Sequence, residues 1–357
     1  MKIYVYVALM LMVGGMVSCG TDKPRNMEAD ILSVSLYAGD SLIAYGADYY
    51  NDSVIDFYVS KRSSYENIRV MFTLSDGASV EPPSGKLYNL SESVPFVVTS
   101  EDGENKRHYS LSLHEKLGMD AWHFDFENWN KAIENDVVYY EPVGWSSANK
   151  GVAMLLGLIG NKFPTTRTND SYSGDYAVCI ETLKGLCGSS MVPPLISGTA
   201  FVGKFNTTYL MVDNLRCAEF GLPFDYDGVH RPKYLQAAVK YTPGQVFYDE
   251  NCNIASDRAD GFSLTAILFT GDEPFTNRDM MHSDRIIAKA TAYPYGPHPE
   301  YGIVKVAFDY ATYGNREIPE NELLQIAIIA GSSIEGDFFR GAPGSRLTID
   351  DVEILFE

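Results

Sequence analysis

Apolar and polar residues alternate in short runs along most of this chain. Between residues 30 and 116 the runs are ILSVSLY, VIDFYVS, IRVMFTL, VPFVVTS and HYSLSL. A period of two predicts β-strands with one buried face. The Asp-Gly pairs in SDGA and EDGEN are typical of the turns that join antiparallel strands. Together these runs predict an immunoglobulin-like β-sandwich over residues 30–116.

A second, longer series of strand-like runs occupies residues 117–357. It reads AWHFDFE, YAVCIETL, GTAFVGKF, YLQAAVKY, GFSLTAILFTG, RIIAKATAY, GIVKVAFDY, LLQIAIIAG and SRLTIDDVEILFE. Only AMLLGLIG and PENELL have a helical pattern, and both are short. The predicted fold class is therefore all-β, with the immunoglobulin-like sandwich followed by a larger jelly-roll β-sandwich.

The run WHFDFENW, residues 122–129, opens this second series. In an extended chain Trp122, Phe124 and Phe126 point to one face, and His123, Asp125 and Glu127 to the other. We expect the three aromatic rings to enter the core. No role follows for His123.

The last run carries a break in its alternation. In RLTIDDVEILFE the apolar positions shift by one residue at Asp350-Asp351, as a β-bulge would produce. If the last strand pairs near the first, these acids could meet Asp125 or Glu127. Clustered carboxylates suit a hard cation, so Glu127, Asp350 and Asp351 are predicted to hold a structural calcium ion. The alternative is that the acids are solvated or pair with Lys and Arg.

The N-terminus has the pattern of an export signal. Lys2 precedes the apolar run IYVYVALMLMVGGMV, which is too short to span a bilayer as a helix and leads to Ser18 and Cys19. A cysteine at this place resembles a bacterial lipobox, whose thiol is lipidated. We expect a signal peptide over 1–18, lipidation of Cys19 and a linker over 19–29. The predicted location is the outer membrane, on the cell surface or the periplasmic face, and a plain secretory signal is the alternative.

Composition restricts the possible partners. The net charge is −19, from 28 Lys and Arg against 47 Asp and Glu, which disfavours binding to nucleic acid or anionic lipid. Aromatic residues make up 13% of the chain, which suits both β-structure and sugar binding. Beyond Cys19, four cysteines remain: Cys179, Cys187, Cys217 and Cys252. Three pairings are possible, and a buried free thiol at Cys179 is equally compatible with the sequence.

Sugar binding requires flat aromatic faces beside amide, carboxylate or guanidinium groups. The stretch EPVGWSSANKG offers this mixture through Trp145 and Asn149, on what the sequence predicts to be a loop. Further candidates are Trp129, Arg167, Asp225, His230 and Arg231. Each of these residues could equally serve packing or loop anchoring, because large aromatic side chains are mostly buried.

Several longer stretches resemble known families. Residues 118–357 resemble the putative carbohydrate metabolism domain family of Bacteroides lipoproteins, through FDFENW, GWSSANKG, GLPFDYDGVHRPKYLQAAVKYTPG and GSRLTIDDVEILF. The stretch from FTLSDGASVEPPSGKLYNL to HYSLSLHEK resembles the immunoglobulin-like spacer domains of the same lipoproteins. The resemblance implies a jelly roll similar to carbohydrate-binding modules. Family members often carry aromatics where this chain has Ala238 and Val239, so a stacking platform on that strand is not expected here.

These observations favour a lipid-anchored, non-catalytic protein that binds an oligo- or polysaccharide and works beside other glycan-utilisation proteins. The sequence contains no HExxH, CxxC or GxSxG motif. A glycoside hydrolase is the alternative, and it would need a pair of carboxyl groups drawn from Glu127, Glu141, Asp175 and Asp225. An adhesin or assembly subunit, marked by an exposed edge strand, is a third possibility.

Overall fold

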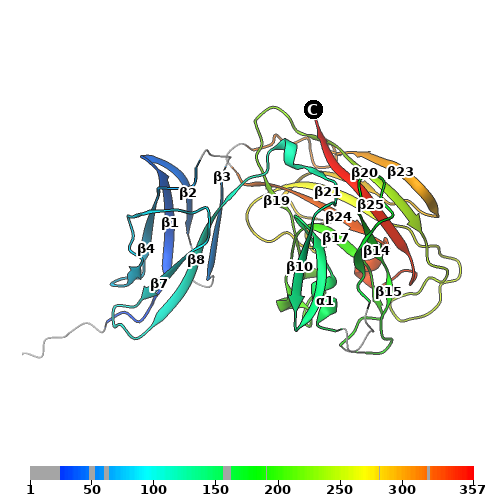
Figure 1. Ribbon diagram of the computed structural model, residues 1–357, viewed down its shortest axis with the longest axis horizontal. Helices are drawn as coiled ribbons and strands as arrows, with labels where there is room; N and C mark the ends of the chain where they lie inside the picture. Colours follow the sequence, from blue (N-terminus) through cyan, green and yellow to red (C-terminus); the bar gives the residue numbers. More distant parts are fainter. Residues whose placement is uncertain are drawn as a thin grey trace, which may run out of the picture. The chain divides into compact units, whose positions relative to one another are not determined.

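The computed structural model describes residues 25–47, 53–59, 64–155, 162–189, 191–280, 282–319 and 322–357. The predicted signal peptide, Cys19 and the first part of the linker lie outside these residues. The chain divides into two compact units, an N-terminal one that ends at His114 and a C-terminal one that runs from Glu115 to Glu357 (Figure 1). Within the described residues, no helix has the length and apolar character needed to span a membrane.

The N-terminal unit consists of two four-stranded sheets, ordered β2-β1-β4-β6 and β3-β8-β7-β5. Ile31, Leu36, Val70 and Phe96 are among the residues that fill the core between them. The five predicted runs form β1, β3, β4, β7 and β8, and the sequence did not indicate β2, β5 and β6. The bounds are β1 Ile31–Ala38, β2 Ser41–Ala47, β3 Val54–Val59, β4 Ile68–Leu74, β5 Ser79–Glu81, β6 Leu87–Tyr88, β7 Val94–Thr99 and β8 Lys106–Glu115.

The C-terminal unit is a two-layer β-sandwich. Sheet I has the order β12-β17-β24-β21-β22, with β18 beside β17 and β19 beside β24. Sheet II has the order β13-β14-β25-β20-β23, with β9 beside β25. Its strands β14, β25, β20 and β23 are labelled in Figure 1. From β20 onward the chain crosses repeatedly between the sheets, since β21, β22 and β24 belong to sheet I, and β23 and β25 to sheet II. The predicted all-β class, with a larger jelly-roll sandwich after a smaller one, is confirmed.

The strands of sheet I are β12 Trp145–Ser147, β17 Thr199–Phe205, β18 Ala218–Phe220, β19 Leu222–Phe224, β21 Ser263–Thr270, β22 Ile286–Ala292 and β24 Leu324–Gly331. Those of sheet II are β9 His123–Phe124, β13 Thr165–Thr168, β14 Ala177–Glu181, β20 Pro232–Thr242, β23 His298–Ala307 and β25 Arg346–Phe356. Two short hairpins, β10 Trp129–Glu134 with β11 Val137–Pro142 and β15 Leu183–Lys184 with β16 Leu195–Ile196, complete the strands.

Sheet I is covered on both faces. Residues such as Val202, Leu264 and Ile328 point into the sandwich core. Their neighbours along the strands form a second apolar cluster on the outer face, which includes Phe201 and Ile329. A strand buried on both faces needs apolar residues at successive positions, and this explains the continuous apolar stretch in GFSLTAILFTG.

The two helical predictions fit poorly. The helix α1 covers Asn149–Ala153 and so begins before the apolar run AMLLGLIG, of which residues 156–160 lie outside the described part. In PENELL, residues 320 and 321 lie outside it as well, and Leu324 begins β24. Short apolar runs do not distinguish a helix from a buried strand.

The segment WHFDFENW is not one strand. Only His123–Phe124 is extended, and Phe126 has a φ of 55°. The burial pattern nevertheless follows the prediction, because Trp122 and Phe126 are buried while His123 and Asp125 are exposed. Trp122 contacts Phe124 edge-to-face, with 6.3 Å between ring centroids. The aromatic side of this segment therefore belongs to the sandwich core.

The predicted bulge in the last strand is confirmed. Gln236 on β20 faces Glu353 on β25, whereas Ala238 faces Asp350, so β25 holds one extra residue. Asp351 takes up the irregularity with a φ of 43°. The last strand also pairs with the first, the condition on which the calcium prediction depends, since Glu353 lies opposite His123.

Candidate functional site

A cavity of about 210 Å³ opens over the outer face of sheet I. Its floor is built by alternate residues of three neighbouring strands: Thr199 and Phe201 on β17, Ile329 and Gly331 on β24, and Ser263 and Thr265 on β21. Loops around residues 193–197, 205–217, 277–280 and 334–339 form its walls.

The strand register explains why the floor is hollow. Gly331 lies opposite both Thr199 and Ser263, so the row across the sheet contains only one small polar residue on each side of a glycine. A Cβ atom at Gly331 would approach Ser263 Oγ to 2.8 Å. Any larger side chain at this position would therefore fill the floor.

Polar side chains gather at this end of the cavity. Tyr293 follows β22 directly and is 49% exposed, and Asn277 Nδ2 donates to Asp337 Oδ1 at 3.2 Å. Asp337 is exposed as a residue, but the loss of water around its carboxyl group raises the pKa of that group to about 6. Burial, together with the negative charge of Asp337, also raises the pKa of Tyr293. A tyrosine ring, an amide, hydroxyls and a carboxyl group therefore lie around one opening.

The wall loop that carries Asp337 is anchored by a buried carboxylate. Asp260 is 2% exposed, and its Oδ2 accepts hydrogen bonds from Ser333 Oγ at 2.6 Å, Ala342 N at 2.8 Å and Ser345 Oγ at 2.7 Å. Its Oδ1 accepts from Gly261 N at 2.9 Å. Burial raises the pKa of Asp260, and these donors oppose that shift. Because Ser333 lines the cavity, this network fixes one side of it.

A second cavity of about 230 Å³ is lined by neighbouring residues of the same loops. Its lining includes three acids, Glu219, Glu273 and Asp279. Glu219 accepts a hydrogen bond from Asn206 at 2.7 Å and forms an ion pair with Lys204 at 3.2 Å. Asp279 accepts a hydrogen bond from Thr276 Oγ1 at 2.9 Å. Two of its carboxylates therefore already have protein partners.

Two of the predicted sugar-binding residues require correction. Trp145 is only 4% exposed and packs edge-to-face on Phe124 and Phe126, at 5.4 and 5.2 Å between centroids. Asn149 is 1% exposed. Its side-chain NH2 donates to the carbonyl of Thr165, and its side-chain oxygen accepts from the N–H of Thr165. The stretch EPVGWSSANKG therefore contributes to the core and its closure, because β12 inserts Trp145 as a core strand residue.

Trp129 and Arg167 lie apart from the cavity lining. Trp129 is half-buried at the start of β10, and its Nε1 donates to the carbonyl of Phe126 at 2.7 Å. Arg167 is exposed on β13 in sheet II, where its guanidinium lies 4.2 Å from the centre of the Tyr176 ring.

The remaining three candidates lie near the start of β20. His230 Nδ1 is 2.6 Å from Asp227 Oδ2, and Arg231 NH2 is 3.2 Å from Glu357 Oε1. The backbone of Arg231 also bonds to that of Glu357 in both directions. Asp225 is half-buried and donates its backbone N–H to Leu117. None of the seven predicted residues lines either cavity.

The predicted calcium ligands do come together, around the loop 170–176. Glu127 Oε1 accepts from the backbone N–H groups of Asp175 and Tyr176, at 2.9 and 3.1 Å. Asp350 is fully buried, and its Oδ2 accepts from the backbone of residues 172 and 173. Asp351 accepts from the hydroxyl of Ser173 at 3.0 Å.

The three carboxylates thus hold this loop through protein hydrogen bonds. Within the described ranges, no group of three or more His, Cys, Asp or Glu side chains is placed to hold a metal ion. The calcium ion remains a prediction. Of the predicted hydrolase acids, Glu141 accepts from the N–H and hydroxyl of Ser147, and burial raises its pKa.

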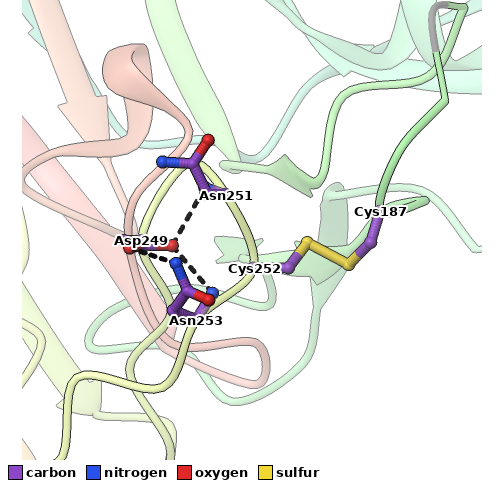
Figure 2. The surroundings of a disulfide bond; sticks show 5 residues. All are labelled: Cys187, Asp249, Asn251, Cys252 and Asn253. Atoms are coloured by element: carbon purple, nitrogen blue, oxygen red, sulfur yellow. Dashed lines mark hydrogen bonds between the residues drawn. A yellow bond between two sulfur atoms is a disulfide. The ribbon is translucent and has the colours of Figure 1, made fainter.

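The described residues show which of the four cysteines are paired. Cys187 and Cys252 form a disulfide, while Cys179 and Cys217 are free. Figure 2 shows that Cys252 lies in a turn held by Asp249, whose carboxylate accepts hydrogen bonds from Asn251 and Asn253 (Figure 2). The bridge ties this turn to the loop after β15, which returns through β16 to the cavity wall.

Sequence reasoning missed the cavity residues because their signal is weak. Ser263, Gly331 and Tyr293 are the terminal or flanking residues of apolar runs, and nothing in a single run shows that they lie side by side. The break from apolar to small residues at the ends of GFSLTAILFTG and LLQIAIIAG was the one available hint.

The fold and the cavity define a jelly-roll domain with a partly polar, partly apolar pocket on one sheet. A family model described as "Putative carbohydrate metabolism domain" matches residues 123–355, so the chain belongs to this family. A second model, described as "SGBP, N-terminal", matches residues 46–112. With the disulfide, this N-terminal match indicates an extracytoplasmic protein.

Two solved structures share this architecture. One, from Bacteroides thetaiotaomicron VPI-5482 and described as a putative glycoside hydrolase, is 26% identical over 95% of this chain and 99% of its own, with a TM-score of 0.63. Another, from Bacteroides vulgatus ATCC 8482 and described in the same words, is 26% identical over 68% of this chain and 100% of its own, with a TM-score of 0.57. No curated protein matches the chain.

Proposed function

We propose that this protein is a lipid-anchored glycan-binding protein of the outer membrane, that it binds an oligo- or polysaccharide without cleaving it, and that the cavity over sheet I is the binding site. The supporting observation is the lining of that cavity, where the half-exposed ring of Tyr293 lies among hydroxyl, amide and carboxyl groups. Such a set matches the stacking surfaces and hydrogen-bonding groups that a sugar requires.

The number of acids favours binding over hydrolysis. Among the described residues that line this cavity, Asp337 is the only carboxylic acid. Glycoside hydrolysis by the common mechanisms needs two carboxyl groups, separated by about 5 to 9.5 Å. The alternative of a hydrolase is favoured by the description of the two similar structures, and the second cavity, with its three acids, is the place where it would act.

A paired substitution tests the site. Gly331→Val would fill the floor beside Ser263, whereas Gly302→Val on β23 is a matched control, because nothing lies within 4 Å of a Cβ atom there. We expect glycan-array binding by residues 20–357 to be lost in the first variant and kept in the second. Equal binding by both would place the site elsewhere.

The same array distinguishes the alternatives when released sugar is measured as well. Binding without release supports the proposal, and release that survives Gly331→Val would favour a hydrolase with a different site. Absence of binding to every glycan, together with strand exchange between copies, would favour an adhesin or assembly subunit.

A ring-removal variant gives an independent readout. Tyr293→Ala is expected to weaken binding at least about fivefold, because stacking and burial of an aromatic ring contribute on the order of 1 to 3 kcal/mol. Tyr140→Ala is the control, since Tyr140 is 50% exposed on β11 and does not line the cavity.

A further inference from the structure

The floor of the cavity changes character along the strands. The row formed by Thr199, Gly331 and Ser263 is small and polar. Two residues further along β17 and β24, the next row presents Phe201 beside Ile329, with Thr265 beyond them on β21. At roughly 3.3 Å per residue, these two rows are about 7 Å apart, which is comparable with the width of a single sugar ring and its substituents.

Further apolar side chains line the cavity, and one of them, Phe205, packs against the cluster that contains Phe201 and Ile329. Phe205 and Leu210 both line the cavity, and both contact the position of Gly151 on α1, where a Cβ atom would lie 3.0 Å from Phe205 and 3.3 Å from Leu210. The hydrogen-bonding groups lie at the other end, with Ser263, Tyr293 and the Asn277–Asp337 pair.

We infer that the cavity selects a sugar residue that carries a methyl group, either as the C6 of a 6-deoxyhexose or as an N-acetyl group. This inference rests on the proposed function. The ring hydroxyls would bond at the polar end, and the methyl group would lie against Phe201 and Ile329, in the part of the cavity that Phe205 and Leu210 also line. A hydroxyl against Phe201 would lose its water without gaining a partner, which is unfavourable, because the hydroxyl of Thr265 lies two strands away on β21.

Matched pairs of methyl glycosides test the selectivity: L-fucose against L-galactose, L-rhamnose against L-mannose, and N-acetylglucosamine against glucose. Each competes with the best array glycan for residues 20–357, the chain without the predicted signal peptide and lipidated Cys19. We expect the methyl-bearing member of at least one pair to compete about tenfold better than its partner, since a single apolar group in a fitted pocket discriminates by that order. Selectivity in the first two pairs identifies a 6-deoxyhexose, and selectivity in the third an N-acetylhexosamine.

A substitution links this selectivity to the apolar wall. Leu210→Asn should reduce the preference to less than twofold, while Met211→Asn, at an exposed neighbour that does not line the cavity, should leave it unchanged. Both variants are first compared with the parent chain for thermal stability.

The failure of the inference differs from the failure of the proposed function. If an array glycan binds but no pair is discriminated, including the case in which none of the six glycosides competes, the inference is overturned while glycan binding stands. If no glycan binds at all, the proposed function fails.

Discussion

Removal of the buried Asp260 carboxylate should destabilise the C-terminal unit by about 3 kcal/mol. Its two oxygens accept four hydrogen bonds, two from the backbone N–H groups of Gly261 and Ala342 and two from serine hydroxyls. In Asp260→Ala the hydroxyls can turn, and Ser333 still has Thr182 Oγ1 at 2.7 Å.

The two backbone N–H groups have no such freedom. Each buried donor left without an acceptor costs about 1 to 3 kcal/mol. The sum is about 2 to 6 kcal/mol, and the lower half of this range applies because burial of the carboxylate, which raises its pKa, already opposes folding. Asp260→Asn should cost less than Asp260→Ala, since its amide oxygen keeps one acceptor, but it should still destabilise, because its NH2 group would face donors on the other side.

Urea unfolding at pH 7, followed by tryptophan fluorescence, measures this effect. All three tryptophans, Trp122, Trp129 and Trp145, lie in the C-terminal unit, so the signal reports on that unit. Asp257→Ala, at an exposed residue of the same segment, is the control and should change the unfolding free energy by less than about 0.5 kcal/mol. A loss below about 1 kcal/mol for Asp260→Ala would refute the reasoning.

The structure also supports four shorter predictions. Asp337 has a pKa of about 6, and its carboxylate form accepts hydrogen bonds from sugar hydroxyls, so the glycan affinity should fall as the pH drops through 6. Titration calorimetry at pH 7.5 and pH 5 measures this change. An affinity that does not depend on pH, in both the parent chain and Asp337→Asn, would contradict the prediction. Because its folded pKa lies above the ordinary 3.8, the native state binds more protons between about pH 4 and 6, and this group should lower the unfolding free energy as pH rises across that window. If calcium binds at the loop 170–176, added Ca²⁺ should raise the Tm of the parent chain and not that of Glu127→Gln; an unchanged Tm in both would remove the ion from the account. The Cys187–Cys252 bridge spans 65 residues, so its reduction should lower the unfolding free energy by about 4 kcal/mol. Urea unfolding with and without reductant measures this loss. An identical midpoint would show that the bridge does not constrain the unfolded chain.

Much of the fold was predictable because strand signals are local. The alternation in ILSVSLY and IRVMFTL sufficed for β1 and β4, and the break at Asp350-Asp351 was enough to place the bulge in β25. Short strands such as β5 and β6 were not predictable, because two or three residues contain no measurable period. The helix predicted from AMLLGLIG begins at Ala153, whereas α1 covers Asn149–Ala153 and so ends there. The prediction missed it because its sequence, NKGVA, is mostly buried but partly polar.

The candidate site was less predictable from the sequence than the fold was. The sequence by itself determined the alternation that makes an all-β chain, the break in alternation at Asp350-Asp351, and the burial of Trp122 and Phe126. Only the tertiary structure decided which residues share a cavity. Thr199, Ser263, Tyr293 and Gly331 come from four strands or their ends, and register across a sheet depends on all the strands together. For the same reason Trp145, which is attractive as an exposed sugar platform in sequence, is a core residue: a period of two shows that a strand has two faces, and only the packing of the sheets decides which face is buried.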